Sequence, residues 1–262
     1  MKNFFAALVM FLFALPCFAQ DLSLYQKKEY SYSEGKVLPY RILYPENYDK
    51  DKKYPLVLVL HGAGERGNDN EKQLVHGSKL FLSEANRKDY PAIVVFPQCP
   101  ENSFWSSVSV DQNKTPILFE FNYDNPITWP LDAVQQLVSQ LQSTEAVDKK
   151  RTYITGLSMG GMGTFEMMYR FPKLFAAALP ICGGGDAMRY DERVKKTSFW
   201  VFHGAVDAVV NVNESIAMVN KLKDIKAAVT YTEYPNVNHN SWDNAFAEPT
   251  FLSWMFSHKR KK

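Results

Sequence analysis

Short, unbroken apolar runs recur along the chain and alternate with longer segments of helical spacing. The runs are "YPLVLVLHG", "YPAIVVFPQ", "RTYITG", "FAAALPICG", "TSFWVFHG" and "AAVTYTEYP", and glycine or proline lies at the end of most of them. Continuous runs of this kind are typical of strands buried on both faces of a sheet. Residues 24–44 alternate instead, with a turn at Ser33-Glu34-Gly35, which predicts an antiparallel opening.

Four segments between and after these runs predict helices. "PLDAVQQLVSQLQS" spaces its leucines and valines at helical intervals from Leu131 to Leu141, with a proline in the first turn. The others are "GMGTFEMMYRF", "NESIAMVNKLKDI" and "NAFAEPTFLSWMFS", the last interrupted at Pro249. Alternating strands and helices predict an α/β fold, with a mostly parallel sheet and helices on both faces. Ligands of such sheets bind at the carboxyl ends of the strands.

The first residues have the pattern of a signal peptide. Lys2 precedes an apolar run, and Cys17-Phe18-Ala19 provides a small-x-small site, which predicts cleavage after Ala19. The run is shorter than the ~20 apolar residues that span a bilayer. The alternative is a buried N-terminal helix. We expect a secreted or periplasmic protein without stable membrane insertion, with residues 1–19 as signal peptide and 20–262 as a single domain.

Charge and cysteine content narrow the possible partners. The formal net charge of +2 provides no electrostatic case for nucleic acid. Cys99 and Cys182 each follow a predicted strand, and these strands are not expected to be neighbours, so we expect free thiols rather than a disulfide. No spacing of cysteine and histidine resembles a zinc site, so no metal is expected.

A glycine-rich turn surrounds Ser158. The sequence Gly156-Leu157-Ser158-Met159-Gly160 lies between the run "RTYITG" and a predicted helix. A nucleophilic serine on such a strand-to-helix turn projects above the sheet, and glycines two residues either side remove side chains that would collide. The helix N-terminus adds free N–H groups and a positive dipole. The alternative is an ordinary glycine-rich turn, but the flanking strand and helix favour the nucleophile.

A serine hydroxyl needs a base to become nucleophilic. Asp207 follows the strand "TSFWVFHG", and His239 follows the last predicted strand. The order serine, acid, histidine is that of α/β-hydrolases. Asp186, after "PICGGG", is the alternative acid. The remaining histidines are expected to have other roles: His76 and His258 at the surface, His203 as a packed neighbour, and His61 at the start of a second glycine-rich turn.

This second turn, "HGAGERGNDN", directly follows the run "YPLVLVL". Acyl transfer needs at least two N–H donors aimed at the developing oxyanion. The residue after the nucleophile, Met159, provides one, and the loop after the third strand provides the other. Ala63 is the expected second donor, with Gly62 and Gly64 as alternatives. No G-K-[ST] follows, so the turn is not a phosphate-binding loop.

Together, "LVLVLHGAGERG", "GLSMGGMGTFEM", "FHGAVDAVV" and "NHNSWD" resemble the α/β-hydrolase superfamily. They are most similar to exported serine esterases grouped with polyhydroxybutyrate-depolymerase-like, feruloyl-esterase-like and "predicted peptidase" hydrolases. The resemblance covers nearly the whole chain after residue 19. It implies an eight-stranded sheet in one catalytic domain, with Ser158 as nucleophile, Asp207 as acid, His239 as base and the amides of Ala63 and Met159 as oxyanion donors. Such enzymes require no metal or organic cofactor.

The resemblance identifies the substrate poorly. We expect a small-molecule or carbohydrate-linked ester, such as an acetyl or feruloyl ester of plant polysaccharide. The alternatives are a serine peptidase of the same fold and a catalytically silent ligand-binding member. Residues 100–129 exceed a short crossover and are interpreted as a pocket wall or flap, or else as a surface excursion. Trp105, within them, is expected to line the substrate site. Trp242, near His239, is expected to pack its loop or, alternatively, to contact substrate.

Overall fold

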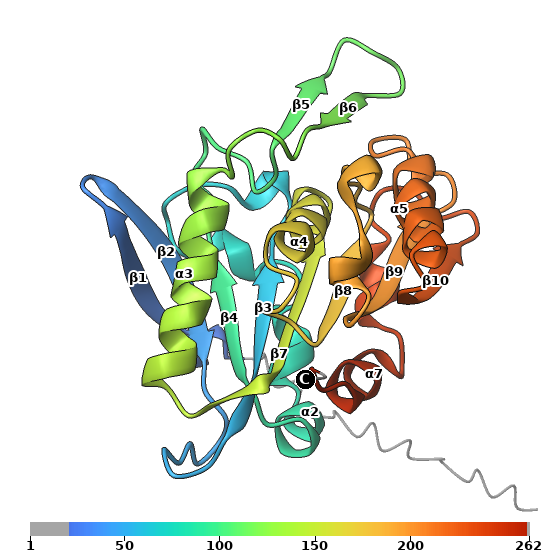
Figure 1. Ribbon diagram of the computed structural model, residues 1–262. Coiled ribbons are helices and arrows are strands. Elements are labelled where there is room, and N and C mark those ends of the chain that lie inside the picture. The colour runs from blue at the N-terminus through green and yellow to red at the C-terminus, as the bar shows by residue number, and fades with distance from the viewer. Residues whose placement is uncertain (1–20, 261–262) are drawn as a thin grey trace, which may run out of the picture.

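An eight-stranded sheet forms the centre of the molecule in this computed structural model, which describes residues 21–260 (Figure 1). The predicted signal peptide, residues 1–19, lies outside the described residues. The strand order is β1 (Gln26–Ser33), β2 (Lys36–Leu43), β4 (Ile93–Pro97), β3 (Tyr54–Leu60), β7 (Val147–Leu157), β8 (Ala177–Ile181), β9 (Ser198–Gly204) and β10 (Ala228–Tyr234).

The pairing of these strands confirms the predicted α/β fold with a mostly parallel sheet. β1 and β2 pair antiparallel across a turn at which Gly35 has a φ of 71°, and β2 pairs antiparallel with β4. All neighbours from β4 to β10 are parallel. The carboxyl ends of six strands therefore meet at one edge of the sheet, where Ser158, Asp207 and His239 each follow a strand.

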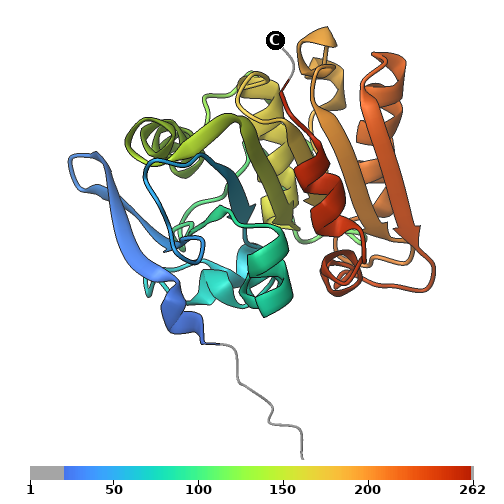
Figure 2. The ribbon, with the colours of Figure 1, turned by 90° about the horizontal axis from the view of Figure 1, so that it is seen from below.

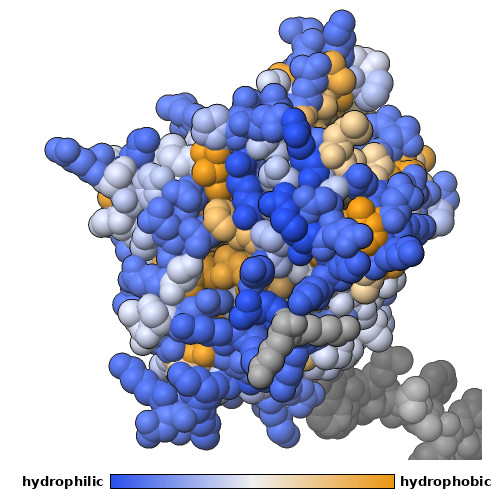
Figure 3. Space-filling view, in the orientation of Figure 1, coloured by the Kyte–Doolittle hydropathy of each residue, from blue (hydrophilic) through white to orange (hydrophobic). Residues whose placement is uncertain are grey.

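Helices cover both faces of the sheet, as predicted (Figure 2). One face carries α3 (Trp129–Thr144), α4 (Met159–Arg170) and α5 (Val212–Asp224), and the other carries α1 (Ser78–Leu82), α2 (Glu84–Asp89), α6 (Trp242–Phe246) and α7 (Phe251–Ser257). The break between α6 and α7 includes Pro249, as expected. The short helices α1 and α2 were not predicted. Hydrophilic side chains cover most of the face seen in Figure 3, because the helices turn their apolar sides toward the sheet.

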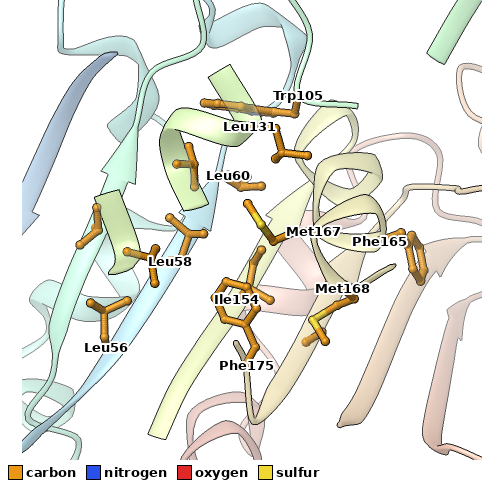
Figure 4. Close-up of a cluster of buried hydrophobic side chains, with 14 of the residues drawn as sticks. Leu56, Leu58, Leu60, Trp105, Leu131, Ile154, Phe165, Met167, Met168 and Phe175 are labelled. Carbon is orange, nitrogen blue, oxygen red and sulfur yellow. The ribbon is translucent and has the colours of Figure 1, made fainter. Parts of the chain in front are cut away.

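Two apolar clusters fill the space between the sheet and its helices. Every residue of β3 is buried, and its side chains alternate between the two faces. Leu56, Leu58 and Leu60 pack with α3 and α4 (Figure 4), whereas Val57 and Val59 belong to the cluster under α1 and α7. Burial on both faces explains why the central strands are continuous apolar runs in the sequence.

The predicted excursion at residues 100–129 forms a hairpin of its own. β5 (Val108–Asp111) and β6 (Leu118–Phe121) pair antiparallel as a separate two-stranded sheet. Figure 1 shows the hairpin standing beyond the carboxyl ends of the central strands. It therefore lies on the side of the sheet where ligands of such folds bind.

A buried carboxylate ties the base of this hairpin to α4. The side chain of Glu166 has no exposed surface. Its oxygens accept hydrogen bonds from Ser106 Oγ at 2.7 Å, Ser107 N at 2.5 Å, Ser107 Oγ at 2.9 Å and Arg170 Nε at 2.7 Å. A buried charge is tolerated only when it is paired and hydrogen-bonded in this way. The sequence predicted the helix but did not single out Glu166.

Replacing Glu166 by alanine is expected to destabilise the fold by about 3 kcal/mol, because Arg170 and the Ser107 amide lose their buried partner. Urea unfolding measures the effect. The matched control is Glu192→Ala, which removes an exposed ion pair with Lys195 and should change stability little. Equal midpoints for the two variants would contradict the anchoring role.

Candidate active site

Ser158 occupies a strained turn between β7 and α4. Its φ of 52° and ψ of −117° are unusual for a residue other than glycine. Its N–H donates to the Ile181 carbonyl at 2.9 Å, and its own carbonyl accepts from Met162 N at 3.0 Å. The turn is therefore tied both to β8 and to its own helix, and the side chain projects from the carboxyl edge of the sheet.

The surrounding glycines have the geometric reason that the sequence suggested. A Cβ on Gly156 would meet the backbone of Gly160, and a Cβ on Gly160 would lie 2.8 Å from the His61 carbonyl oxygen. A Cβ on Gly161 would lie 2.5 Å from the Ile181 carbonyl oxygen. All these neighbours are backbone atoms, which cannot move aside as a flexible side chain can. Glycine is therefore required for α4 to begin so close to the sheet.

The structure brings the three predicted triad residues together. His239 Nε2 lies 2.9 Å from Ser158 Oγ, and His239 Nδ1 lies 2.8 Å from Asp207 Oδ2. A carboxylate only accepts, so Nδ1 carries a hydrogen and Nε2 is free to accept from the serine hydroxyl. The side chain of Asp207 is fully buried and that of His239 is 18% exposed. The arrangement can remove a proton from Ser158.

The carboxylate of Asp207 is held by several donors. Oδ1 accepts from the backbone N–H groups of Val209 at 2.8 Å and Val210 at 2.9 Å. Burial alone would raise the pKa of Asp207, but interactions with His203 and His239 outweigh it and hold the pKa well below its usual range. The group is therefore ionised at neutral pH and can orient the imidazole.

The alternative acid, Asp186, points elsewhere. Its Oδ2 accepts a hydrogen bond from the Tyr123 backbone N–H at 3.2 Å, at the base of the hairpin. It follows β8 rather than β9, and it is Asp207 that contacts His239. The structure thus shows which of the two carboxylates contacts His239, a question that sequence spacing alone left open.

The two expected oxyanion donors both begin helices. Met159 is the first residue of α4, and Ala63 is the first residue of a short 3-10 helix, Ala63–Glu65. The first N–H groups of a helix have no partner within it. The loop before Ala63 lies beside the nucleophile, since a Cβ on Gly62 would be 3.7 Å from Ser158 Cβ.

His61 fixes this loop through two hydrogen bonds. Its Nε2 accepts from Cys99 N at 2.9 Å, so Nδ1 carries the hydrogen that it donates to the Gly62 carbonyl at 2.6 Å. Burial lowers the pKa of His61 to about 4, which keeps the ring neutral at physiological pH. The histidine at the start of the turn thus joins the end of β3 to the end of β4.

The expectation that Trp105 lines the substrate site is wrong. Its side chain is fully buried, and its Nε1 donates to the His61 carbonyl at 3.1 Å. Figure 4 shows the indole packed in the core beside Leu131 and Leu60. The first part of the excursion folds inward over α4, so the tryptophan supports the loop instead of facing solvent.

Trp242 begins α6 and remains partly exposed. Its ring meets the His239 ring edge-on at a centroid distance of 5.3 Å and lies 5.1 Å from the ring of His76. It also packs against the cluster under α6 and α7. These contacts place Trp242 beside the candidate base, and the expected packing role and the alternative substrate contact both stay predictions.

The sequence missed the position of Cys182 beside these residues. Both Cys99 and Cys182 are free, as predicted, and both are buried. Within residues 21–260, Cys182, Asp207 and His239 form the group that could hold a metal, with ligand atoms within 4.8 Å of one another. Burial raises the pKa of the Cys182 thiol strongly, so the thiolate that a metal requires is disfavoured. Hydrogen bonding to the acid already occupies His239 Nδ1.

Known proteins with similar sequences or folds include several esterases. The chain is 26% identical to the bifunctional acetylxylan esterase/xylanase of Neocallimastix patriciarum over 79% of its own length, and it spans only 28% of that protein. A thermostable esterase superposes with a TM-score of 0.82 and 38% identity, covering 91% of this chain and 64% of the other. A ferulic acid esterase from Anaeromyces mucronatus, solved with ferulic acid, superposes with a TM-score of 0.62 at 17% identity, covering 88% and 91%.

Over the described part of the chain, no helix combines the length and apolar character needed to cross a membrane.

Residues 33–223 match the Esterase family, whose description is "Putative esterase". This match covers well over half of the chain and includes both Ser158 and Asp207. The eight-stranded sheet and its helices form the α/β-hydrolase fold, and the chain belongs to the Esterase family.

Proposed function

We propose that the protein is a serine carboxylesterase that hydrolyses carboxylic esters through an acyl-enzyme. The observation that carries the proposal is the continuous line of contacts from Asp207 through His239 to Ser158, with 2.8 and 2.9 Å between the polar atoms. A serine, a base and an acid in this geometry perform nucleophilic acyl transfer. Membership of the Esterase family supports the same reaction.

In the proposed mechanism, Ser158 Oγ attacks the ester carbonyl carbon while His239 Nε2 takes the hydroxyl proton. Asp207 holds the imidazole in its tautomer and stabilises the imidazolium that forms. The tetrahedral oxyanion receives hydrogen bonds from the amides of Met159 and Ala63. The alcohol leaves with the proton from His239, and a water molecule, activated by the same base, then releases the acid from Ser158.

We propose that the alcohol part of the substrate is carbohydrate. An open groove lies between the β5–β6 hairpin and the loop after β8. Its polar lining comes from Ser109, Glu120, Asn122, Asp124, Asn125, Asp186 and Arg189, and Phe121 and Met188 complete it. Carboxylate, amide and guanidinium groups are suited to ligands rich in hydroxyl groups. Relatives named as acetylxylan and ferulic acid esterases support acetyl or feruloyl esters of plant polysaccharide.

The walls of the groove contact the helix that follows Ser158 through glycines. A Cβ on Gly184 would lie 3.0 Å from the Phe121 ring, and a Cβ on Gly161 would lie 3.1 Å from Gly183 Cα. The hairpin therefore rests on the loop after β8, and that loop rests on the helix that begins after Ser158. We therefore propose that the alcohol part of an ester bound at Ser158 reaches this groove.

Ser158→Ala should abolish hydrolysis of p-nitrophenyl acetate while the protein stays folded, because no other group on this turn can form the acyl-enzyme. A fluorophosphonate should label the wild-type protein at Ser158 and leave the variant unlabelled. Activity near the wild-type level in a pure variant would overturn the assignment. A folded wild-type protein that is neither labelled nor active would favour the silent binding alternative.

Asp207→Asn should lower kcat by about four orders of magnitude, because an asparagine amide favours the wrong imidazole tautomer. Asp186→Asn is the matched control and should cause a far smaller loss on p-nitrophenyl acetate, since its carboxylate bonds the hairpin base. Circular dichroism checks that both variants fold. A larger loss at position 186 would move the acid to the loop after β8.

The double variant Glu120→Ala/Asn122→Ala should lower kcat/KM on acetylated xylan by about fivefold, the loss expected for roughly one net hydrogen bond. It should leave p-nitrophenyl acetate nearly unaffected, because that substrate has no sugar to occupy the groove. Glu34→Ala, on the exposed β1–β2 turn, controls for loss of surface charge. Equal effects on the two substrates would argue against a sugar subsite.

A further inference from the structure

A second buried imidazole contacts the carboxylate of Asp207. His203 lies near the end of β9, and its side chain has no exposed surface. Its Nε2 is 3.2 Å from Asp207 Oδ2, the same oxygen that His239 Nδ1 reaches at 2.8 Å. The same Nε2 is 2.9 Å from the Val210 carbonyl oxygen. Two imidazoles therefore meet at one carboxylate oxygen, and the mechanism above uses only one of them.

The partners of His203 determine where its protons lie. Both neighbours of Nε2, the Val210 carbonyl and the Asp207 carboxylate, are acceptors, so Nε2 carries a hydrogen. On the other side, Nδ1 lies 2.7 Å from Ser215 Oγ, which itself donates to the Gly183 carbonyl at 2.8 Å. A hydroxyl has a single hydrogen, which Ser215 can give either to the Gly183 carbonyl or to Nδ1. If the hydroxyl turns toward Nδ1, Nε2 still carries its hydrogen.

These contacts also join the elements that form the site. Val210 belongs to the loop of the acid, Ser215 to α5, and Gly183 to the loop after β8. Gly183 packs directly on Gly161, in the first turn of α4. A single buried side chain thus links the acid loop to the helix that begins after the nucleophile.

We propose that His203 is a positioning residue that holds the Asp207 carboxylate in the orientation that His239 needs. The proposal rests on the esterase function proposed above. Oδ1 is held by the amides of Val209 and Val210, and Oδ2 by the two imidazoles. A carboxylate held at both oxygens cannot rotate away when the charge on His239 changes during the reaction.

The charged groups around His203 fit a positioning role rather than a role in raising the basicity of His239. Asp207 faces it from its own loop and Glu214 from α5, while His239 and Cys182 lie on the far side of Asp207. Burial raises the pKa of Glu214, an effect that attraction to His203 partly offsets. Because His203 and His239 share one oxygen of Asp207, the effect of His203 on the site is one of geometry.

Two substitutions at the same position separate the two nitrogens. In His203→Asn the amide can replace Nδ1 and keep the contact with Ser215, but nothing reaches Asp207. In His203→Gln the amide nitrogen can take the place of Nε2. On p-nitrophenyl acetate, we expect the Asn variant to lose about 10- to 100-fold in kcat, typical of a misplaced catalytic group, with KM nearly unchanged. We expect the Gln variant to recover most of this loss. His258→Asn, at a histidine bonded to the Trp254 carbonyl, controls for the substitution itself.

A double-mutant cycle distinguishes positioning from general damage. In an Asp207→Asn background there is no carboxylate left to orient, so His203→Asn should cause little further loss. If the losses in kcat from the two substitutions multiply, or if the Asn and Gln variants lose equally in kcat, the proposal is overturned and His203 is a core residue only.

If the Asn variant does not fold, Ser215→Ala provides a second test because it removes the partner of Nδ1. This variant should have a lower kcat with an unchanged KM, and an unchanged kcat would count against the proposal.

The rate of fluorophosphonate labelling of Ser158 provides a second readout that needs no ester substrate. Slow labelling of His203→Asn with normal labelling of His258→Asn would support positioning even if the natural ester is not p-nitrophenyl acetate. Wild-type protein that is not labelled would refute the proposed function. Wild-type labelling with an unaffected Asn variant would refute only the role of His203.

Discussion

The candidate site depends on how closely the start of α4 approaches the end of β3. A Cβ on Gly160 would lie 2.5 Å from the carbonyl carbon of Leu60 and 2.8 Å from the carbonyl oxygen of His61. No residue other than glycine allows this approach. The same contact brings the N-terminus of α4 beside the loop that carries Ala63. The positive φ of Ser158 costs about 1–3 kcal/mol, and the bonds to Ile181 and Met162 hold the turn in place.

Buried polar groups around this turn differ in the partners that hold them. Burial keeps His61 neutral while its Nε2 accepts an N–H from Cys99, whereas both neighbours of His203 Nε2 are acceptors. Asp207 stays ionised although it is buried, because donors surround it. Each group would be costly to bury alone, by several kcal/mol for a charge. The carboxyl edge of the sheet tolerates them because each is satisfied by a neighbouring strand end or loop.

The parts of the site that depend on local sequence could be predicted. Ser158, Asp207 and His239 each follow a strand, and parallel strands bring their carboxyl ends together, so chain order favoured them, although it left Asp186 open as an alternative acid. The direction in which a side chain of the excursion would point depends on tertiary contacts. Trp105 was expected at a pocket wall because it lies in the excursion, but the chain there turns inward over α4 and buries it. Glu166 could not be found from spacing, because its partners Ser106 and Ser107 are about 60 residues away.

The anchoring of the hairpin suggests how one scaffold can keep its chemistry while its substrate changes. Glu166 fixes the base of the hairpin to α4, the helix that starts at the nucleophile, whereas the strands of β5 and β6 pair only with each other. Ser109 and Glu120, which line the groove, lie on these two strands, so substitutions there alter the groove without removing a contact of Ser158. Substitutions at the base reach the core through a buried charge and affect folding first. Under the proposed function, ester recognition in the groove and catalysis at Ser158 are thus joined at one carboxylate, because Glu166 connects the hairpin that lines the groove to the helix that begins after the nucleophile.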